Sequence, residues 1–420
     1  MTTSTHWPEA VTSRVPKGMR WSDRVVRLAY LLMGWVYRNR FAGDTPPPSE
    51  LARTILVNAC IEGVGNMLLF TPVLQVLRRA FPQAQITAMA YDNVAGELLV
   101  ACPLIDSLHR VSPSKRAVVR QIEVLRQQQW DLVVNVDTHW TGLVFAVVPA
   151  QFSVSHTVDG LSNQYGLTLR QVGLYTRLVP IRPGVHEVEH NLDLVRALGA
   201  FIDPEDARPT CWLPEETETN AMELLKKVGW QGESLIAFQP GTSPTMAWKR
   251  WSPERFAAVA DALIARGGKK VLLLGSAQDR SICNFVQEQM EHEAINLAGR
   301  TTIFEAAAVI RRCELFVGND SGLMHLAAAQ QVPVVVVVGP TDFLRSGPVS
   351  EIHRVVDSGG RCQRCYALHP RMPTLCPFGR ACLMDITVAQ VRQAAESLLT
   401  LGTARSRGYL GVLGMAEEGG

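Results

Sequence analysis

The loop at residues 318–322, which has glycine at both ends, is the part of this sequence best suited to bind an anion. It follows a short apolar run and precedes a helix-forming stretch, so we expect a strand, a glycine turn and a helix that begins near Asp320 or Ser321. The free N–H groups of a first helical turn bind phosphate oxygens, and small residues such as Gly322 let a ligand approach the backbone. The loop therefore predicts a pyrophosphate site.

Two residues of this stretch also have a purely structural interpretation. Asp320 could be only the N-cap of the helix, and His325, about one turn further on, could be a packed core residue. A second polar loop, 339–342, follows the valine-rich run 334–338. Because the carboxyl ends of parallel strands meet at one edge of a sheet, this second loop favours a ligand-binding role.

A second candidate loop, residues 239–243, also follows an apolar run and carries the hydroxyls of Thr242 and Ser243. Lys249 comes shortly after it. Hydroxyl groups and one lysine, acting as a point charge, suit the oxygens of a diphosphate. The alternative is that Lys249 and Arg250 are solvated loop charges.

A third glycine loop, residues 62–66, joins an apolar run to a long helix-forming stretch and contains Gly63, Gly65 and Asn66. Leu68 stands where the third glycine of a dinucleotide fingerprint belongs, so the match to that fingerprint is weak.

These loops require strands and helices that alternate along the chain. We expect strands at 54–59, 85–90, 132–136, 143–148, 235–238, 270–274, 315–317 and 334–338, and helices from the third loop through 79 and at 254–265, 303–312 and 323–330. Short apolar runs next to helices are typical of strands buried on both faces of a parallel sheet. The pattern predicts an α/β protein of two doubly wound halves, with ligands bound in a cleft at the carboxyl ends of the strands.

Composition narrows the class of protein. The 420 residues are 47% hydrophobic and 19% charged, which excludes a disordered or fibrous chain and allows two to three domains. A net charge of +2 argues against a general nucleic-acid binder. Nine scattered cysteines, no long apolar run and no secretory signal at the start of the chain predict a cytoplasmic protein.

The first fifty residues differ from the rest. Residues 20–40 are rich in aromatic and apolar side chains with arginines at both ends, which suits an amphipathic helix in a membrane interface or, equally, a helix packed on the protein itself. We expect an N-terminal extension, a first Rossmann-like domain, an interdomain segment, a second Rossmann-like domain and a flexible tail, at residues 1–48, 49–205, 206–232, 233–405 and 406–420.

Taken together, the three loops resemble glycosyltransferase family 9, the lipopolysaccharide heptosyltransferases. The matching residues lie at 63–68, 71–72, 78–82, 240–241, 249–251, 318–322, 325–328 and 339–342. The resemblance implies a GT-B fold, with the acceptor on the first domain and the nucleotide sugar on the second. It also implies an inverting transfer of heptose from ADP-heptose to a lipid-linked glycan, without a metal or other cofactor, at the inner face of the cytoplasmic membrane.

The resemblance also implies roles for individual residues. Thr242, Ser243 and Lys249 would hold the donor diphosphate, and Asp320 would contact the sugar–phosphate region. The backbone at Ser321, Gly322 and Leu323 would cradle phosphate, with His325 nearby. The loop that begins with Gly275 and Ser276 would line the nucleoside, although the ribose-binding acid of some members is not evident there.

The chain departs from the family at one catalytic position. Many members use an aspartate after the glycine of the first loop as general base, and this chain has Asn66 there. An amide cannot accept a proton at neutral pH, so the base must come from elsewhere, be dispensable or be missing. Glu62, Asp137 and His139 are the candidates; we place Asp137 first, although it could equally be a turn or helix cap.

Four cysteines form the remaining candidate cluster: Cys362, Cys365, Cys376 and Cys382. They could bind structural zinc, or they could be free thiols or part of an acceptor-site loop. A glycosyltransferase is the favoured hypothesis. A noncatalytic binder of nucleotide sugars, suggested by Asn66, and a nucleotide-dependent oxidoreductase or epimerase are the alternatives.

Overall fold

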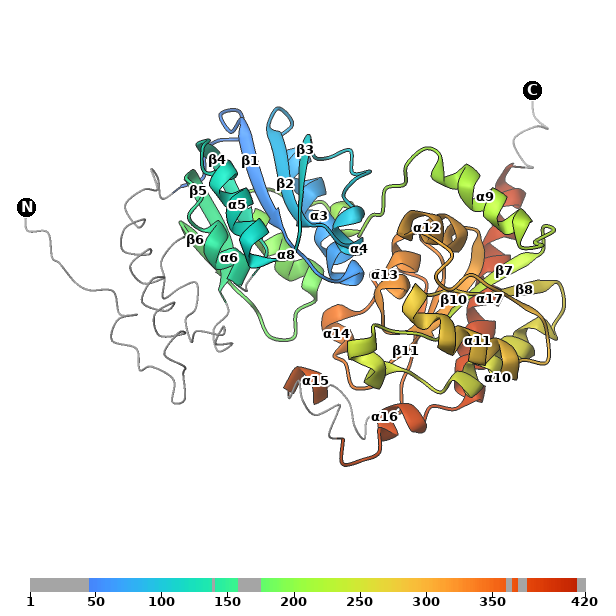
Figure 1. Ribbon diagram of the computed structural model, residues 1–420. Helices are drawn as coiled ribbons and strands as arrows, with labels where there is room; N and C mark the ends of the chain where they lie inside the picture. Colours follow the sequence, from blue (N-terminus) through green and yellow to red (C-terminus); the bar gives the residue numbers. More distant parts are fainter. Residues whose placement is uncertain (1–44, 138–139, 158–174, 360–364, 369–375, 414–420) are drawn as a thin grey trace, which may run out of the picture. The chain divides into compact units, whose positions relative to one another are not determined.

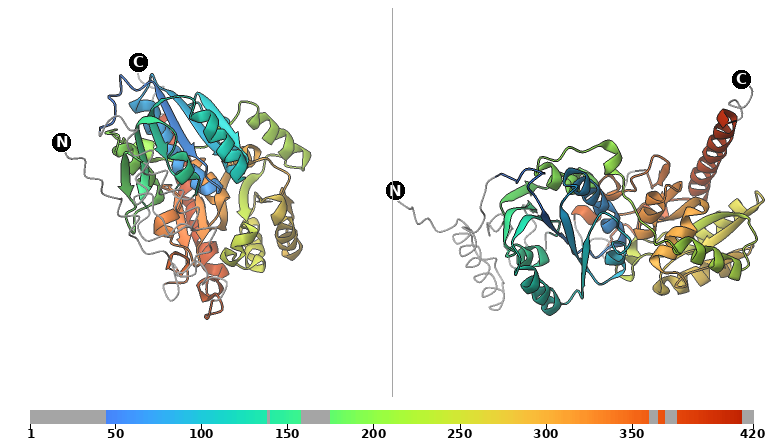
Figure 2. Two further views of the ribbon diagram at one scale, coloured as in Figure 1. Left: turned by 60° about the vertical axis from the view of Figure 1, so that its left-hand side comes forward. Right: turned by 90° about the horizontal axis from the view of Figure 1, so that it is seen from above.

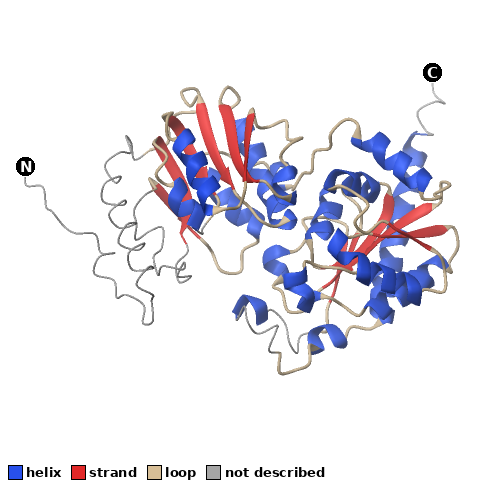
Figure 3. Cartoon of the chain, viewed as in Figure 1, coloured by secondary structure: helices blue, strands red, loops and turns tan. Residues whose placement is uncertain are grey.

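The computed structural model describes residues 45–137, 140–157, 175–359, 365–368 and 376–413. The chain divides after Ala207 into two compact units, each with its own parallel sheet between layers of helices (Figure 1 and Figure 3). The expected segment 20–40 lies outside the described residues.

Unit 1 contains a parallel sheet of six strands in the order β3-β2-β1-β4-β5-β6. The strands are β1 (Thr54–Ala59), β2 (Gln85–Tyr91), β3 (Ser107–Val111), β4 (Trp130–Asn135), β5 (Ala150–Thr157) and β6 (Arg177–Pro180). The helices are α3 (Val64–Ala80), α4 (Val94–Glu97), α5 (Lys115–Leu125), α6 (Trp140–Phe145) and α8 (Glu187–Arg196), followed by the 3-10 turn η2 (Pro204–Ala207). Helices α5 and α6 cover one face of the sheet, and α3 packs with α8 on the other.

Unit 2 repeats this plan with the order β12-β11-β10-β7-β8-β9. Its strands are β7 (Ser234–Gln239), β8 (Lys269–Leu273), β9 (Ala294–Asn296), β10 (Cys313–Asn319), β11 (Val334–Val337) and β12 (His353–Val356). Figure 2 shows the twisted sheet and its helices from two sides. The helical elements are α9 (Thr217–Lys227), η3 (Pro244–Lys249), α10 (Pro253–Ile264), η4 (Ala277–Asp279), α11 (Arg280–Gln289), α12 (Ile303–Arg311), α13 (Gly322–Ala329), α14 (Phe343–Ser346), α15 (Cys365–Leu368), α16 (Ala381–Met384) and α17 (Val388–Leu413).

Each sheet has a switch point, where the chain changes the direction in which it adds strands. In unit 1 this point lies between β1 and β4, and in unit 2 between β7 and β10. Loops that follow these neighbouring strands diverge to opposite faces of the sheet and leave a crevice, which is the usual ligand site of open α/β sheets. The strand order of unit 2 therefore places two of the predicted loops, those after β7 and β10, at its switch point.

Helix α3 of unit 1 contains Pro72 in its interior. Proline has no N–H to donate to the carbonyl of Leu68, one turn earlier. The hydroxyl of Thr71 donates to this carbonyl instead, at 2.7 Å, and the side-chain amide of Asn191 on α8 donates to the carbonyl of Leu69 at 3.1 Å. The Thr71–Pro72 pair thus supplies its own replacement for the missing hydrogen bond, because the Thr71 hydroxyl donates in place of the absent N–H of Pro72.

The expected strand at 143–148 is wrong. Residues Trp140–Phe145 form helix α6, and the strand that pairs with β4 is Ala150–Thr157. A short apolar run fits a buried helix as well as a strand, and here the backbone N–H of Gly142 bonds to the carboxylate of Asp137 at the start of the helix.

The strands β3, β6, β9 and β12 were not expected from the sequence. They are short and lie at or near sheet edges, so they bury too few apolar residues to produce a clear run. In the part of the chain that the structure describes, no helix is both long enough and apolar enough to cross a membrane.

Candidate functional site

The loops after β7 and β10 meet at the switch point of unit 2. Gln239 at the end of β7 pairs in register with Gly318 on β10. Gly318 leaves room for this close approach, since a Cβ built there would lie 2.8 Å from the ring of Phe316 and 3.2 Å from the carbonyl oxygen of Gln239. The two predicted anion loops therefore lie side by side.

Lys249 and Asp320 form an ion pair between these loops. Lys249 Nζ lies 3.1 Å from Asp320 Oδ2, although the residues are 71 positions apart in the chain. The side chain of Asp320 is 7% exposed and that of Lys249 is 19% exposed. The lysine is thus held by a buried carboxylate and still reaches the surface, where it can contact an anion.

Helix α13 begins next to this pair. Ser321 is its N-cap in extended conformation, but its hydroxyl does not bond to the first turn of the helix. The hydroxyl instead donates a short hydrogen bond to the side-chain oxygen of Gln239. Gly322 and Leu323 follow at the partly exposed first turn, while His325 is buried inside the helix. Ser321 therefore does not cap the N–H groups of the first turn. A helix start that binds phosphate needs its N–H groups left uncapped in this way.

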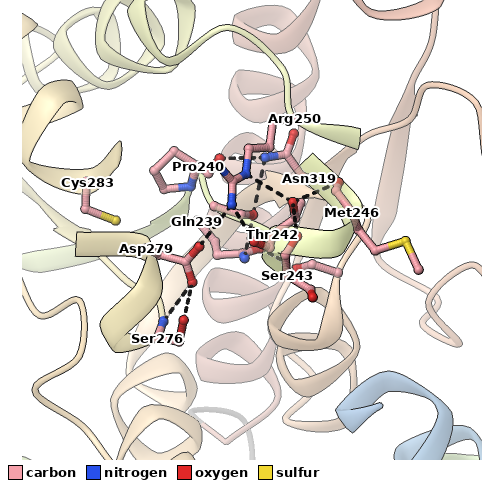
Figure 4. Close-up of polar contacts among 12 residues, drawn as sticks. Gln239, Pro240, Thr242, Ser243, Met246, Arg250, Ser276, Asp279, Cys283 and Asn319 are labelled. Atoms are coloured by element: carbon pink, nitrogen blue, oxygen red, sulfur yellow. Dashed lines mark hydrogen bonds and ion pairs between the residues drawn. The ribbon is translucent and has the colours of Figure 1, made fainter. Parts of the chain in front are cut away.

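Two buried amides fix the geometry of this edge. The side-chain amide of Gln239 donates to the carbonyl of Gly241 at 2.7 Å, and that of Asn319 donates to the carbonyl of Pro240 at 2.8 Å (Figure 4). Asn319 also accepts from the backbone N–H of Trp251 at 2.9 Å. Asn319 satisfies backbone groups of the neighbouring loop, and Gln239 bonds to its own loop while accepting from Ser321 of the other, so the two loops are held together.

Thr242 and Ser243 occupy different environments in the loop after β7. Thr242 is buried, and its hydroxyl donates to the carbonyl of Met246 at 3.0 Å while accepting from Arg250 Nε at 3.1 Å (Figure 4). The hydroxyl of Ser243 is exposed and lies 3.0 Å from that of Thr245. Ser243 is therefore on the surface, whereas Thr242 is buried and its hydroxyl bonds within the protein.

The loop after β8 is organised around Asp279. Ser276 N-caps the turn η4, and the Asp279 carboxylate accepts from both the backbone N–H and the hydroxyl of Ser276, at 2.9 and 2.7 Å. Gly275 packs directly on Asp279, while the next three residues of this loop, 276–278, are exposed.

At the switch point of unit 1, α3 begins with Gly63 as N-cap and carries Gly65 and Asn66 in its first turn. Asn66 is exposed, as is Glu62, whereas Gly65 is buried. Gly63 has no side chain to cap the helix, so these N–H groups also lack a side-chain cap.

Asp137 follows β4 at the same switch point. One of its carboxylate oxygens accepts a hydrogen bond from the N–H of Gly142 at 3.1 Å. This contact is of the capping kind that the sequence analysis gave as the alternative role for Asp137. Burial, with the Asp137 charge as the second cause, raises the pKa of the Cys60 thiol and the pKa of Tyr175. Burial also raises the pKa of Tyr91 to about 12, although the hydroxyl of Thr141 bonds to it at 2.9 Å. These three groups stay neutral near pH 7, and the Asp137 charge contributes to raising the pKa of each. His139, the third candidate base, lies outside the described residues.

Comparison with known proteins identifies the family. Residues 118–374 match the model of glycosyltransferase family 9 (heptosyltransferase). The chain is 30% identical over 301 residues to lipopolysaccharide heptosyltransferase 3 of Escherichia coli K12, which covers 68% of this chain and 83% of that protein. It is 36% identical over 316 residues to lipooligosaccharide heptosyltransferase 2 of Haemophilus ducreyi, which covers 70% of this chain and 87% of that protein.

The chain belongs to glycosyltransferase family 9. A solved family 9 glycosyltransferase from Veillonella parvula superposes with a TM-score of 0.69 at 25% identity, covering 83% of this chain and 97% of the other. The predicted fold class, GT-B with two Rossmann-like domains, and the predicted activity class, a glycosyltransferase, are confirmed.

The cysteine cluster of this family 9 chain is only partly described. Cys362 lies outside the described residues; Cys365 and Cys376 are partly exposed, and Cys382 is buried in the core of unit 2. Among the residues whose positions are given, no three His, Cys, Asp or Glu side chains lie close enough together to hold a metal ion.

Three residues that shape this site were given no role in it from the sequence: Gln239, Asp279 and Arg250, which was considered as a solvated charge and as part of the family match at 249–251. The signal available for Gln239 was a polar residue directly after an apolar run, a position that faces the ligand edge. Asp279 offered only a capping pattern, since its contacts with Gly241 and Arg250 depend on the tertiary structure.

Proposed function

We propose that this protein transfers a heptose from ADP-heptose to the core of lipopolysaccharide or to another lipid-linked glycan. One observation supports this most directly: Lys249, held by Asp320, lies beside the uncapped start of α13 at the switch point of unit 2. A cation and free N–H groups at such an edge suit the diphosphate of a nucleotide sugar. Relatives are named heptosyltransferases, and a structural neighbour is named for ADP-heptose.

The reaction proposed is a single displacement with inversion. The acceptor oxygen forms a bond to the anomeric carbon of heptose while the bond from that carbon to the diphosphate oxygen breaks, and ADP leaves with the electron pair. Lys249 and the N–H groups of Gly322 and Leu323 stabilise the negative charge that develops on the leaving diphosphate. The hydroxyl proton of the acceptor passes to a base.

We assign the base to Asp137, in unit 1, which would bind the acceptor. Its carboxylate follows β4 at the switch point, has neutral neighbours at Cys60 and Tyr175, and can take a proton that Asn66 cannot. The matched experiment compares Asp137→Asn, which keeps the shape and the Gly142 contact, with Asn66→Asp, which restores the family's usual acid. We expect Asp137→Asn to lower kcat by roughly 10²–10⁴-fold and Asn66→Asp to retain activity.

The proposed acceptor also fixes a location. A lipid-linked glycan would bring the enzyme to the cytoplasmic face of the inner membrane, with the basic and aromatic segment 20–40 as the anchor. A chain that begins at residue 48 should then lose binding to anionic vesicles in a sedimentation assay. Sedimentation equal to that of the full chain would contradict a membrane role for this segment.

The deciding experiment uses the full chain, ADP-heptose and a lipopolysaccharide acceptor that lacks outer heptose. We expect release of one ADP for each heptose added, measured by coupled ADP detection and by mass spectrometry of the acceptor. Binding of ADP-heptose in calorimetry without transfer to any core acceptor would instead favour a noncatalytic binder of nucleotide sugars, the alternative that Asn66 suggests.

A further inference from the structure

Asp279 is a buried carboxylate between two glycines of the donor-side loops. Its side chain is 7% exposed. A Cβ built on Gly241 would lie 2.1 Å from Asp279 Oδ1, and one built on Gly275 would lie 2.7 Å from Asp279 Cβ. Both glycines are therefore needed to admit this carboxylate, which holds the loops after β7 and β8 at a fixed separation.

The two carboxylate oxygens of Asp279 have different partners. Oδ2 accepts two hydrogen bonds from Ser276, whereas Oδ1 accepts none from the described residues and lies 3.8 Å from Arg250 Nη2 (Figure 4). A buried charge is costly unless an opposite charge compensates it. Arg250 supplies that charge for Asp279.

Arg250 connects Asp279 to the loop after β7. Its Nε donates to the Thr242 hydroxyl at 3.1 Å, and its Nη2 donates to the Thr242 carbonyl at 2.7 Å (Figure 4). The next residue, Trp251, is buried and is held by Asn319. The preceding residue, Lys249, reaches Asp320. Arg250 thus fixes the backbone from which the Lys249 side chain extends.

We propose that Asp279, through Arg250, is a positioning residue that holds Lys249 and the Thr242 loop in place for the donor diphosphate. The proposal rests on the donor role assigned to Lys249 under the proposed function. Asp279 directly follows the expected nucleoside loop, and its carboxylate bonds to Ser276 in that loop. Its carboxylate keeps the Arg250 guanidinium turned toward Thr242, while Lys249 reaches Asp320 in the loop after β10.

The first test measures ADP affinity by calorimetry in the full chain. Asp279→Asn keeps the size of the side chain and an acceptor for Ser276 but removes the charge that faces Arg250. We expect a Kd for ADP about tenfold higher than in the wild type, and no further increase when the change is added to Lys249→Ala. An unchanged Kd for ADP in Asp279→Asn would overturn the proposal. It would also be overturned if the increase in Kd of the double variant equalled the product of the increases in the two single variants.

Asp261→Asn is the matched control. Asp261 is a carboxylate of unit 2 that accepts hydrogen bonds from the backbone N–H groups of Glu291 and His292, away from the donor loops. This variant should lose thermal stability while keeping the wild-type Kd for ADP. A merely structural role for Asp279 predicts the same behaviour in both variants.

A second measurement needs no donor. Hydrogen exchange should accelerate in Asp279→Asn, but not in Asp261→Asn, at the N–H groups of Met246 and Arg250, which bond within the loop at 2.8 and 3.2 Å. Equal exchange in both variants would refute the positioning role. If the wild type fails to bind ADP, the proposed function fails while this exchange result still decides the role of Asp279.

Discussion

Single residues at the donor edge act in pairs that only the folded chain creates. Lys249 alone is a flexible surface cation, and Asp320 alone is a carboxylate at a helix start. Their 3.1 Å contact converts them into an oriented, partly exposed ammonium beside the first turn of α13. A preorganised cation loses less side-chain entropy on binding an anion than a free one.

Removing either member of this pair should weaken nucleotide binding. Lys249→Ala deletes the cation, and Asp320→Ala deletes the carboxylate that orients it. We expect each change to reduce the binding free energy of ADP by about 1.5–3 kcal/mol, the range for a charged hydrogen bond. Calorimetry should show no change for Lys226→Ala, an exposed lysine on α9. Wild-type ADP affinity in both site variants would remove these residues from the donor site.

His156 makes the stability of unit 1 depend on pH. Burial lowers the pKa of His156 to about 4; a backbone hydrogen bond to Val179 and the charges of Glu187 and Asp193 oppose this shift, and His190 reinforces it. At pH values between about 4 and the unfolded pKa near 6.5, His156 is protonated in the unfolded chain but neutral in the native chain. Stability should therefore fall as the pH drops through this window, by about 3 kcal/mol at most.

Urea unfolding of the wild type and of His156→Gln, at pH 7 and pH 4, measures this effect. The variant has no titrating group at this position, so its stability should fall less over the same range. The carboxylates of the unit titrate alike in both proteins and cancel in the difference. Equal losses in the two proteins would show that His156 does not contribute.

Among the elements, α3 illustrates how a local pair of residues supports a buried helix. Thr71→Val removes the hydroxyl that satisfies the Leu68 carbonyl above Pro72 but keeps the volume of the side chain. We expect the free energy of unfolding to fall by about 1–3 kcal/mol, because the buried carbonyl loses its donor. Thr71→Ser keeps the donor and should lose less. Equal losses for the two variants in urea unfolding would mean that packing, rather than the hydrogen bond, sets the effect.

Elements with a long apolar run were predictable, and short ones were not. The strands β1, β7, β10 and β11 are buried on both faces, so each leaves an unbroken apolar segment in the sequence. The edge strands contribute few buried residues and leave no such trace. The run 143–148 was misassigned because its helical state depends on a contact from Asp137 and on the position of β5.

At the scale of the whole molecule, two units with separate cores carry the predicted donor and acceptor residues. ADP binds only the native state, so it should stabilise the unit that holds Lys249 and α13. At a hundredfold excess over Kd, this amounts to about 2.7 kcal/mol, or a rise of roughly 5–10 °C in the midpoint of that unit. Differential scanning calorimetry should show this rise in one transition and not in the other. Equal shifts in both would mean that the units unfold together or share the ligand.

The amino-acid sequence by itself determined the α/β class, the repetition of the plan and the loops at which anions could bind. Hydrophobic runs and glycine turns act over a few residues, so they are visible in the chain. The tertiary structure alone decided that Thr242 is buried, that Lys249 meets Asp320 and that Asp279 fills the space left by Gly241 and Gly275. These contacts join residues up to 71 positions apart, and they depend on which strands are neighbours. Strand order is set by the packing of whole helices on the sheet, which no local pattern records.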